Sequence, residues 1–214
     1  MIDEAVGAVP RFDILTVCTG NVCRSPLAEY LLRRGLQGLE GVGISSAGTD
    51  ALVGEGMTDQ TVVLAIAHGA AQPDRHRARA LVVERLRESG LVIALTRAHR
   101  SEIVAMLPRG SRHTFTLREL ARLLEAVQPS DLSAVASRPI YDTAGRFAEL
   151  IEIAAALRGY VAPPEHELDD DVIDPYRRGD DIYALMESQL VPAVDVIANK
   201  FELAATITPD RVRG

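Results

Sequence analysis

The sequence predicts an α/β fold of three layers, in which an open, parallel, four-stranded sheet is covered by helices on both faces. Apolar segments of strand length alternate with amphipathic segments of helix length, which is the pattern that such a sheet requires. The chain has 214 residues, enough to bury a substantial core in one α/β domain without a second one. We therefore expect residues 1–214 to form a single domain.

The expected elements follow one another in regular order. Strands are predicted at residues 13–17, 42–46, 91–95 and 113–116. Helices are predicted at residues 26–37, 58–68, 79–89 and 99–107, with Gly90 as the stop signal of the third. Helical patterns return at residues 117–126, 144–157 and 180–201. Ligands of parallel sheets bind at the carboxyl ends of the strands, so the loop after the first strand is the first place to search for a site.

That loop, residues 18–26, reads Cys-Thr-Gly-Asn-Val-Cys-Arg-Ser-Pro. It lies between a strand end and a helix start, where backbone N–H groups without helical partners and the helix dipole can bind an oxyanion. Gly20 and Asn21 are the residues that most readily adopt left-handed conformations, which would turn successive amides inward. Arg24 adds a planar fork that matches two phosphate oxygens. The sequence therefore predicts a phosphate-binding loop.

Cys18 is the candidate nucleophile of this loop. Inward amides, a helix N-terminus and the Arg24 guanidinium all favour the reactive thiolate over the thiol. Ser25 is placed to donate a hydrogen bond to the sulfur. A Cys-x5-Arg spacing also arises by chance, but the flanking strand, the Gly-Asn pair and the Ser-Pro pair favour nucleophilic catalysis.

The loop resembles the signature loop of the low-molecular-weight protein tyrosine phosphatases, and Asp174-Pro175-Tyr176 resembles the late Asp-Pro general-acid motif of that family. Two weaker matches lie between them, at residues 45–49 (Ser-Ser-Ala-Gly-Thr) and 76–79 (His-Arg-Ala-Arg). All four matches occur in the family's order, which is more specific than any one motif.

The resemblance implies hydrolysis of a phosphomonoester through a phosphocysteine, with no metal or other cofactor. Cys18 would attack phosphorus, and Asp174 would protonate the leaving oxygen and then deprotonate the water. The residues expected to bind substrate with Arg24 are Thr19, Gly20, Asn21, Val22, Cys23, Ser25 and Tyr176. Ser46 would hydrogen-bond the side chain of Asn21. His76 would support the loop, although a solvent-exposed histidine at a helix start remains an equal alternative.

The surroundings of Asp174 are strongly acidic. The neighbouring carboxylates belong to Glu165, Glu167, Asp169, Asp170, Asp171, Asp180 and Asp181. Like charges near Asp174 would favour the protonated form that a general acid needs. Alternatively, the run is a solvated loop whose charges are screened within about 8 to 10 Å. The run lacks the ligand spacing and central glycine of an EF-hand, so we expect no metal there.

The chain departs from the family pattern in two places. Residues 117–167, between the last strand and the Asp-Pro motif, are expected to form a helical insertion that ends near Pro163-Pro164 and caps the site or carries a partner surface. Residues 50–58 offer only Leu52 and Met57 where many family members carry an aromatic residue. Tyr176 is then the remaining aromatic wall, because Tyr141 and Tyr160 are better explained as core residues. This departure weakens the expectation of phosphotyrosine preference.

The net charge limits the classes of partner that the protein can have, and the cysteine content limits its cellular compartment. A net charge of −7 argues against a nucleic-acid partner. No apolar run approaches the roughly 20 residues of a membrane helix, and two cysteines fit a reducing compartment, so we expect a cytoplasmic protein. Cys23 either forms a reversible disulfide with Cys18 or packs as a small buried side chain.

The expected substrate is a phosphorylated protein, above all one carrying phosphotyrosine, or a small phosphoester. Two alternatives stay open. An arsenate reductase would share the loop and the fold, but the chain has no cysteine after Cys23, so it would need a small thiol to complete its redox relay. A non-catalytic phosphate-binding or interaction protein would require neither Cys18 nor Asp174.

Overall fold

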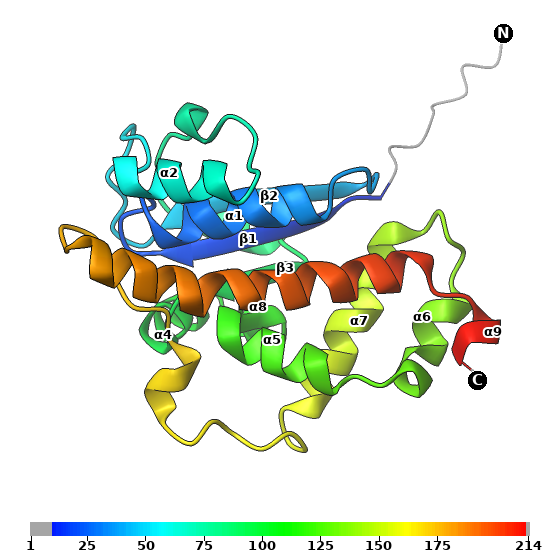
Figure 1. The fold of residues 1–214 in the computed structure, drawn as a ribbon. Coiled ribbons are helices and arrows are strands. Elements are labelled where there is room, and N and C mark those ends of the chain that lie inside the picture. Colours follow the sequence, from blue (N-terminus) through cyan, green and yellow to red (C-terminus); the bar gives the residue numbers. More distant parts are fainter. Residues whose placement is uncertain (1–9, 213–214) are drawn as a thin grey trace, which may run out of the picture.

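The computed structural model describes residues 10–212 and has the predicted three layers (Figure 1). Its sheet consists of β1 (Phe12–Cys18), β2 (Val42–Gly48), β3 (Leu91–Ala94) and β4 (Thr114–Thr116). All neighbouring strands are parallel, and their order is β2-β1-β3-β4. This confirms the predicted fold class, and it brings the carboxyl ends of β1 and β3 side by side at one edge of the sheet.

Helices cover both faces of the sheet. They are α1 (Arg24–Gly35), α2 (Asp59–Ala67), α3 (Val83–Glu88), α4 (Arg97–Met106), α5 (Leu117–Ala126), α6 (Ser133–Ser137), α7 (Thr143–Leu157), α8 (Asp180–Thr206) and α9 (Pro209–Val212). Four 3-10 helices lie at η1 (Pro73–Arg75), η2 (Pro108–His113), η3 (Pro129–Leu132) and η4 (Glu167–Asp170). No helix among residues 10–212 has both the length and the apolar character that crossing a bilayer demands.

Alternate residues of β1 face the two helical layers. Phe12, Ile14 and Cys18 belong to a large core with α1, α5, α7 and α8. Leu15 and Val17 belong to a smaller core with α3 and α4. Because both faces are buried, the strand is mostly apolar, with Asp13 and Thr16 as its polar residues. The long helix α8 packs over the sheet face that carries Phe12 and Ile14, and it contacts α1, α5 and α7 (Figure 1).

One predicted helix is wrong over half its length. Residues 79–89 were expected to be helical, but α3 begins only at Val83. Ala80 instead forms a parallel bridge with Gly48, and the N–H of Gly48 donates to the carbonyl of Arg79 at 2.9 Å. Pairing with the end of β2 therefore overrides the helical pattern, and it places residues 76–79 beside the loop that follows β1.

The segment between β4 and the Asp-Pro motif is helical, as expected, and packs against the fold rather than standing apart from it. Thr116 and Glu119 form a capping box that begins α5, and Asp142 caps α7 through the N–H of Gly145 at 2.9 Å. Tyr141 and Tyr160 are 85% and 87% exposed, so the expectation that they are core residues is wrong. Their positions near the two ends of α7 put both rings in solvent.

A buried arginine ties this segment to the end of α8. Arg146 of α7 has no exposed surface. Its guanidinium donates to the carbonyl of Ala204 at 2.7 Å, to that of Arg138 at 2.6 Å and to that of Ile207. Buried charges require full hydrogen bonding, and here three carbonyls supply it.

Candidate active site

The loop after β1 has the tight backbone that anion binding requires. Asn21 lies in the left-handed region at φ 57°, as predicted. Gly20 does not have a positive φ, so the prediction of two successive left-handed residues is wrong. The end of β2 lies very close to the loop: a Cβ on Gly48 would lie 2.3 Å from the carbonyl oxygen of Thr19. The absent side chain of Gly48 thus lets β2 support the loop.

The side chain of Asn21 is the hydrogen-bonding centre of the loop. Its Nδ2 donates to the hydroxyl oxygens of Ser25 at 2.9 Å and Ser46 at 2.8 Å, and its Oδ1 accepts from the N–H of Arg79 at 2.9 Å. An amide has two N–H hydrogens, and both are used here. The Sγ of Cys18 lies 2.9 Å from the hydroxyl oxygen of Ser25, and the carbonyl of Ala47 lies 3.4 Å from it, so the Ser25 hydrogen has two acceptors within reach.

A buried carboxylate ends this chain of hydrogen bonds. Ser46 donates to Oε2 of Glu29 at 2.5 Å, and Oε1 of the same carboxylate lies 2.6 Å from Nη2 of Arg33. Glu29 is fully buried. Sequence reasoning missed it, although a glutamate four residues after Ser25, on the otherwise apolar face of a helix, was an available signal.

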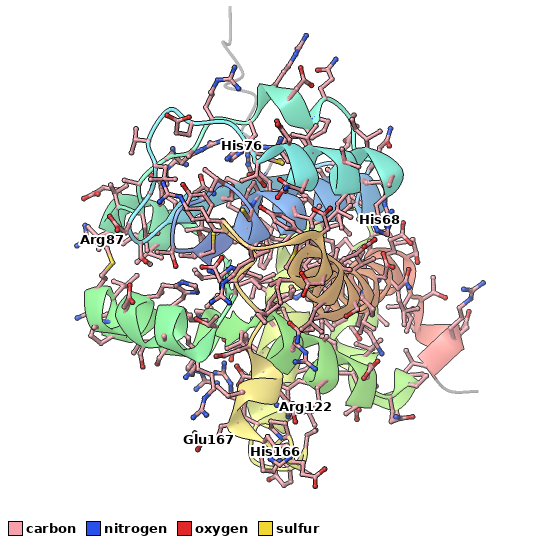
Figure 2. All side chains as sticks on the ribbon, turned by 60° about the vertical axis from the view of Figure 1, so that its left-hand side comes forward. His68, His76, Arg87, Arg122, His166 and Glu167 are labelled. Carbon is pink, nitrogen blue, oxygen red and sulfur yellow. The ribbon has the colours of Figure 1, made fainter. Side chains whose placement is uncertain are left out.

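His76 also contacts the loop. Its Nε2 donates to the carbonyl of Asn21 at 2.7 Å, and only 2% of the residue is exposed. Burial lowers the pKa of His76, so the ring is neutral at physiological pH. The alternative of a solvent-exposed histidine is therefore wrong. In Figure 2 His76 lies on the half of the molecule opposite Arg122 and Glu167.

Arg24 and Asp174 meet directly at the site. Nη2 of Arg24 lies 2.8 Å from Oδ2 of Asp174, and Nη1 donates to the carbonyl of Val172 at 3.1 Å. Arg24 is 4% exposed, whereas half of the Asp174 side chain is exposed. Within the described part of the chain, the buried Nε of Arg24 has no hydrogen-bond partner. The guanidinium thus keeps an unused donor in addition to one that Asp174 occupies.

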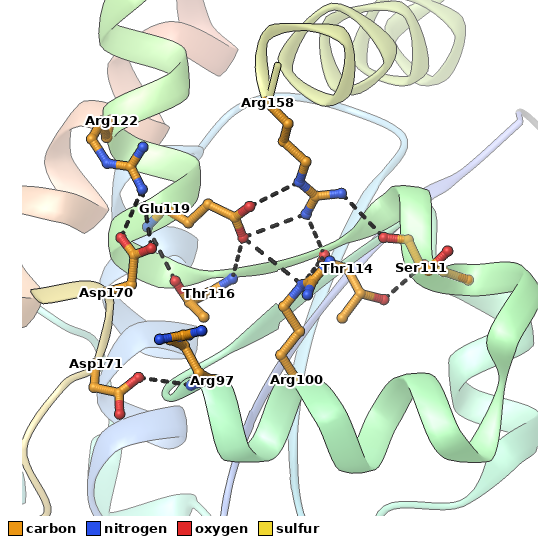
Figure 3. A network of polar contacts seen from close by, with 11 residues as sticks. Arg97, Arg100, Ser111, Thr114, Thr116, Glu119, Arg122, Arg158, Asp170 and Asp171 are labelled. Atoms are coloured by element: carbon orange, nitrogen blue, oxygen red, sulfur yellow. Dashed lines mark hydrogen bonds and ion pairs between the residues drawn. The ribbon is translucent and has the colours of Figure 1, made fainter. Parts of the chain in front are cut away.

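Three of the acidic residues before Asp174 have partners of their own. Asp170 binds Arg122, the carboxylate of Asp171 accepts from the backbone N–H of Arg97 at 2.7 Å, and Glu167 lies 2.7 Å from the Arg97 guanidinium. Figure 3 shows Asp170 and Asp171 held in this way. The expectation that these like charges act on Asp174 is not supported by the geometry, because the charged group in direct contact with Asp174 is Arg24.

Sequence reasoning also missed His99, which follows β3. Its Nε2 lies 2.9 Å from the hydroxyl of Thr19, and its Nδ1 lies 2.8 Å from the hydroxyl of Thr96, the N-cap of α4. Burial, helped by the nearby charge of Arg24, lowers the pKa of His99 to about 4. Its position just beyond the carboxyl end of a central strand, where ligands of parallel sheets gather, was an available signal.

Cys18, Arg24 and Asp174 line one small cavity. Its volume is about 140 Å³, and its lining consists of Cys18, Thr19, Gly20, Val22, Cys23, Arg24, Asp50, Leu52, Asp174 and Tyr176. Asn21 and Ser25 were expected to bind substrate, but neither residue is in this lining. Asp50 is in the lining and was not predicted as a site residue. No residue of 117–167 lines the cavity, so the described structure does not support a capping role for that segment. A larger crevice of about 530 Å³ lies between α3, α4 and β4, away from Cys18.

Cys23 packs under the loop. It is buried, and its Sγ lies 3.6 Å from the hydroxyl of Thr58 and 3.7 Å from that of Tyr183. Burial raises the pKa of the Cys23 thiol, which favours its neutral form. Both cysteines are free thiols in the structure.

Fold and site together define a class of protein, the α/β phosphatases that use a cysteine. Residues 13–127 match the family described as low molecular weight phosphotyrosine protein phosphatase, and the chain belongs to that family. It is therefore a hydrolase that acts on phosphorylated substrates.

Three comparisons illustrate the relationship. The probable low molecular weight protein-tyrosine-phosphatase EpsP of Ralstonia nicotianae is 37% identical over 107 residues, which are 50% of this chain and 71% of EpsP. The low molecular weight protein-tyrosine-phosphatase Etp of Escherichia coli is 32% identical over 128 residues, 60% of this chain and 84% of Etp. The structure of the YwlE arginine phosphatase from Geobacillus stearothermophilus matches with a TM-score of 0.61 and 25% identity, over 89% of this chain and 93% of YwlE.

Proposed function

We propose that Cys18, Arg24 and Asp174 carry out a two-step hydrolysis of phosphomonoesters through a phosphocysteine. The observation that carries this proposal is that all three residues line one cavity of about 140 Å³ at the carboxyl end of β1. In the first step, the thiolate forms a bond to phosphorus while the bond to the leaving oxygen breaks. Asp174, in its protonated form, gives its proton to that oxygen.

The second step regenerates the enzyme. The Asp174 carboxylate takes a proton from water, the water oxygen bonds to phosphorus, and the phosphorus–sulfur bond breaks to restore the thiolate. The Ser25 hydroxyl stabilises the departing sulfur by donating its hydrogen, because a thiolate at 2.9 Å is a stronger acceptor than the carbonyl of Ala47 at 3.4 Å. Arg24 and the amides of the loop neutralise charge on the phosphoryl oxygens in both steps.

Asp174 and substrate share Arg24 in this scheme. In the structure, Asp174 occupies Nη2 of Arg24 while the buried Nε is unpartnered among the described residues. A bound phosphoryl group would satisfy Nε and compete with the carboxylate for Nη2. The carboxylate is half exposed, so it can turn toward the leaving oxygen without unpacking a core.

The preferred substrate that we propose is a protein carrying phosphotyrosine. The cavity has apolar walls from Val22 of the loop and from Leu52, and one aromatic wall from Tyr176. We also propose a cytoplasmic location, because both cysteines are free thiols and thiols stay reduced in that compartment.

Phosphoarginine is the second candidate. Asp50 and Asp174 both line the cavity, and carboxylates would pair with the guanidinium part of that substrate. The structural match to an arginine phosphatase supports the same candidate.

The chemistry is tested with para-nitrophenyl phosphate. We expect Cys18→Ser to abolish hydrolysis and Asp174→Asn to reduce kcat roughly a hundredfold or more, while Arg112→Ala, a surface change at a pair with Glu152, leaves it unaltered. Trapping of a radiolabelled phosphoenzyme by rapid denaturation should succeed with the wild type and fail with Cys18→Ala, which has no nucleophile at this position. A Cys18→Ser variant with wild-type turnover would refute the proposal.

The substrate is tested with matched peptides that carry phosphotyrosine or phosphoarginine at the same position. Tyr176→Ala should lower kcat/KM mainly for phosphotyrosine, because it removes the aromatic wall. Asp50→Asn keeps the shape of the side chain and should lower kcat/KM only for phosphoarginine. A wild-type preference for phosphoarginine that Asp50→Asn removes would replace the first candidate with the second.

A further inference from the structure

The short segment that leads into Asp174, residues 170–173, is held at every position. Asp170 accepts two hydrogen bonds from Nη2 of Arg122, at 2.9 and 3.0 Å. The carbonyl of Asp171 accepts from Nη1 of Arg118 at 3.2 Å, and its carboxylate caps the first residue of α4, Arg97. Two of these anchors, Arg118 and Arg122, belong to α5.

The rest of the segment is fixed to the body of the fold. Val172 donates to the carbonyl of Leu95 at 2.9 Å and its own carbonyl accepts from Arg24, while the N–H of Ile173 donates to Oε1 of Gln189 at 2.8 Å. Asp174 itself is half exposed, and its carboxylate contacts only Arg24 and the N–H of Tyr176 among the residues described. Its position is therefore set by the backbone before it and not by packing of its own side chain.

Helix α5 is a rigid support for its two arginines. They are four residues apart and so lie on one face of the helix. Glu119 fixes the start of α5 through the capping box and pairs with Arg158 of the α7 end at 2.8 Å (Figure 3). The Arg122–Asp170 pair is only 27% and 15% exposed, which reduces screening by solvent.

We propose that Arg122 and Arg118 are positioning residues that hold the Asp174 segment in its catalytic place. The helical segment 117–167, which does not line the cavity, then acts on the reaction through its first helix. This inference rests on the proposed role of Asp174 as the general acid. A mispositioned acid slows proton transfer to the leaving oxygen but leaves binding of the phosphoryl group intact.

The test compares two aryl phosphates. Phenyl phosphate has a poor leaving group that needs the proton, and 2,4-dinitrophenyl phosphate has a good one that does not. Arg122→Ala should lower kcat/KM roughly tenfold on phenyl phosphate and change kcat/KM little on the dinitrophenyl ester, because kcat/KM reports only the step in which the leaving group departs. Inhibition by inorganic phosphate should stay at the wild-type value. Arg122→Lys, which keeps the charge but loses the second donor that Nη1 gives to the carbonyl of Ala162, should recover part of the loss.

Two controls separate positioning from general damage to the fold. Arg112→Ala removes a comparable arginine–glutamate contact away from the Asp174 segment and should affect neither ester. In the Asp174→Asn background, Arg122→Ala should cause no further loss. If Arg122→Ala unfolds the protein, Asp170→Asn replaces it, because that change keeps the side-chain shape and weakens the same pair.

Each contrary outcome has a distinct meaning. An equal loss on both esters, or a further loss in the Asp174→Asn background, would overturn the positioning role and leave Arg122 as a structural residue. If Asp174→Asn itself showed no dependence on the leaving group, the proposed general acid would fail, and the inference would fail with it.

Discussion

The two halves of the catalytic machinery are built by different means. The phosphate-binding loop after β1 (residues 18–26, the cradle) is buried and held by hydrogen bonds among Asn21, Ser25, Ser46 and His76. The Asp174 segment lies at the surface, and arginines from α1 and α5 hold it in place. The nucleophile and the phosphate site therefore rest on contacts with β2 and with residues 76–79 beside the loop, whereas the proton donor depends on how α1 and α5 pack against its segment.

Substitutions in the cradle should lower kcat/KM alike for every substrate, and replacing Arg24 should have the largest effect. Arg24→Lys loses the planar fork and the contact with Val172, and kcat/KM should fall roughly a hundred- to a thousandfold. The loss should be equal for phenyl and 2,4-dinitrophenyl phosphate, since both carry the same phosphoryl group. Steady-state kinetics on the two esters measure this. A loss that grows with the pKa of the leaving group would show that Arg24 acts mainly through Asp174 and would break the comparison.

The backbone of the cradle depends on the Asn21 amide. Asn21→Ala removes three buried hydrogen bonds and places a residue that disfavours left-handed backbone at φ 57°. The free energy of unfolding should fall by about 3 kcal/mol, measured by urea denaturation. Asn21→Gly tolerates the backbone but lacks the amide, so it should recover only a small part. A glycine variant as stable as the wild type would mean that the hydrogen bonds contribute little.

His99 lies between the two regions, and its effect appears in the pH dependence of stability. Because burial lowers the pKa of His99 from 6.5 to about 4, the unfolded chain binds this proton first as the pH falls. The stabilisation is complete above about pH 6.5 and is lost between 6.5 and 4, on the order of 3 kcal/mol at most.

Urea denaturation of His99→Gln at pH 7 and pH 4.5 tests this assignment. Glutamine does not titrate and can still reach the Thr19 hydroxyl, so the fall in stability with pH should be shallower than in the wild type. It should not vanish, because burial also lowers the pKa of His76, which titrates in the same direction. Equal falls in both proteins would exclude His99 as a source of the acid sensitivity.

The extent of sequence prediction follows the same division. The strands, the phosphate loop and the left-handed Asn21 could be predicted because each depends on residues adjacent in the chain. Glu29 and His99 were missed because their roles require side chains brought together by the sheet. For the acidic run before Asp174, the sequence left charge tuning and a solvated loop as alternatives, because the arginine partners, Arg122 among them, lie far away in the sequence.

The position of α8 in the chain has a consequence for synthesis on the ribosome. The sheet is complete at Thr116, but α8, which covers much of the sheet face that carries Phe12 and Ile14, ends at Thr206. At ordinary elongation rates that interval takes on the order of 5 to 20 seconds. During that time Phe12, Phe147 and their neighbours lack their aromatic partner Phe201. Until α8 is made, the apolar surface that it covers in the finished fold stays exposed on the nascent chain.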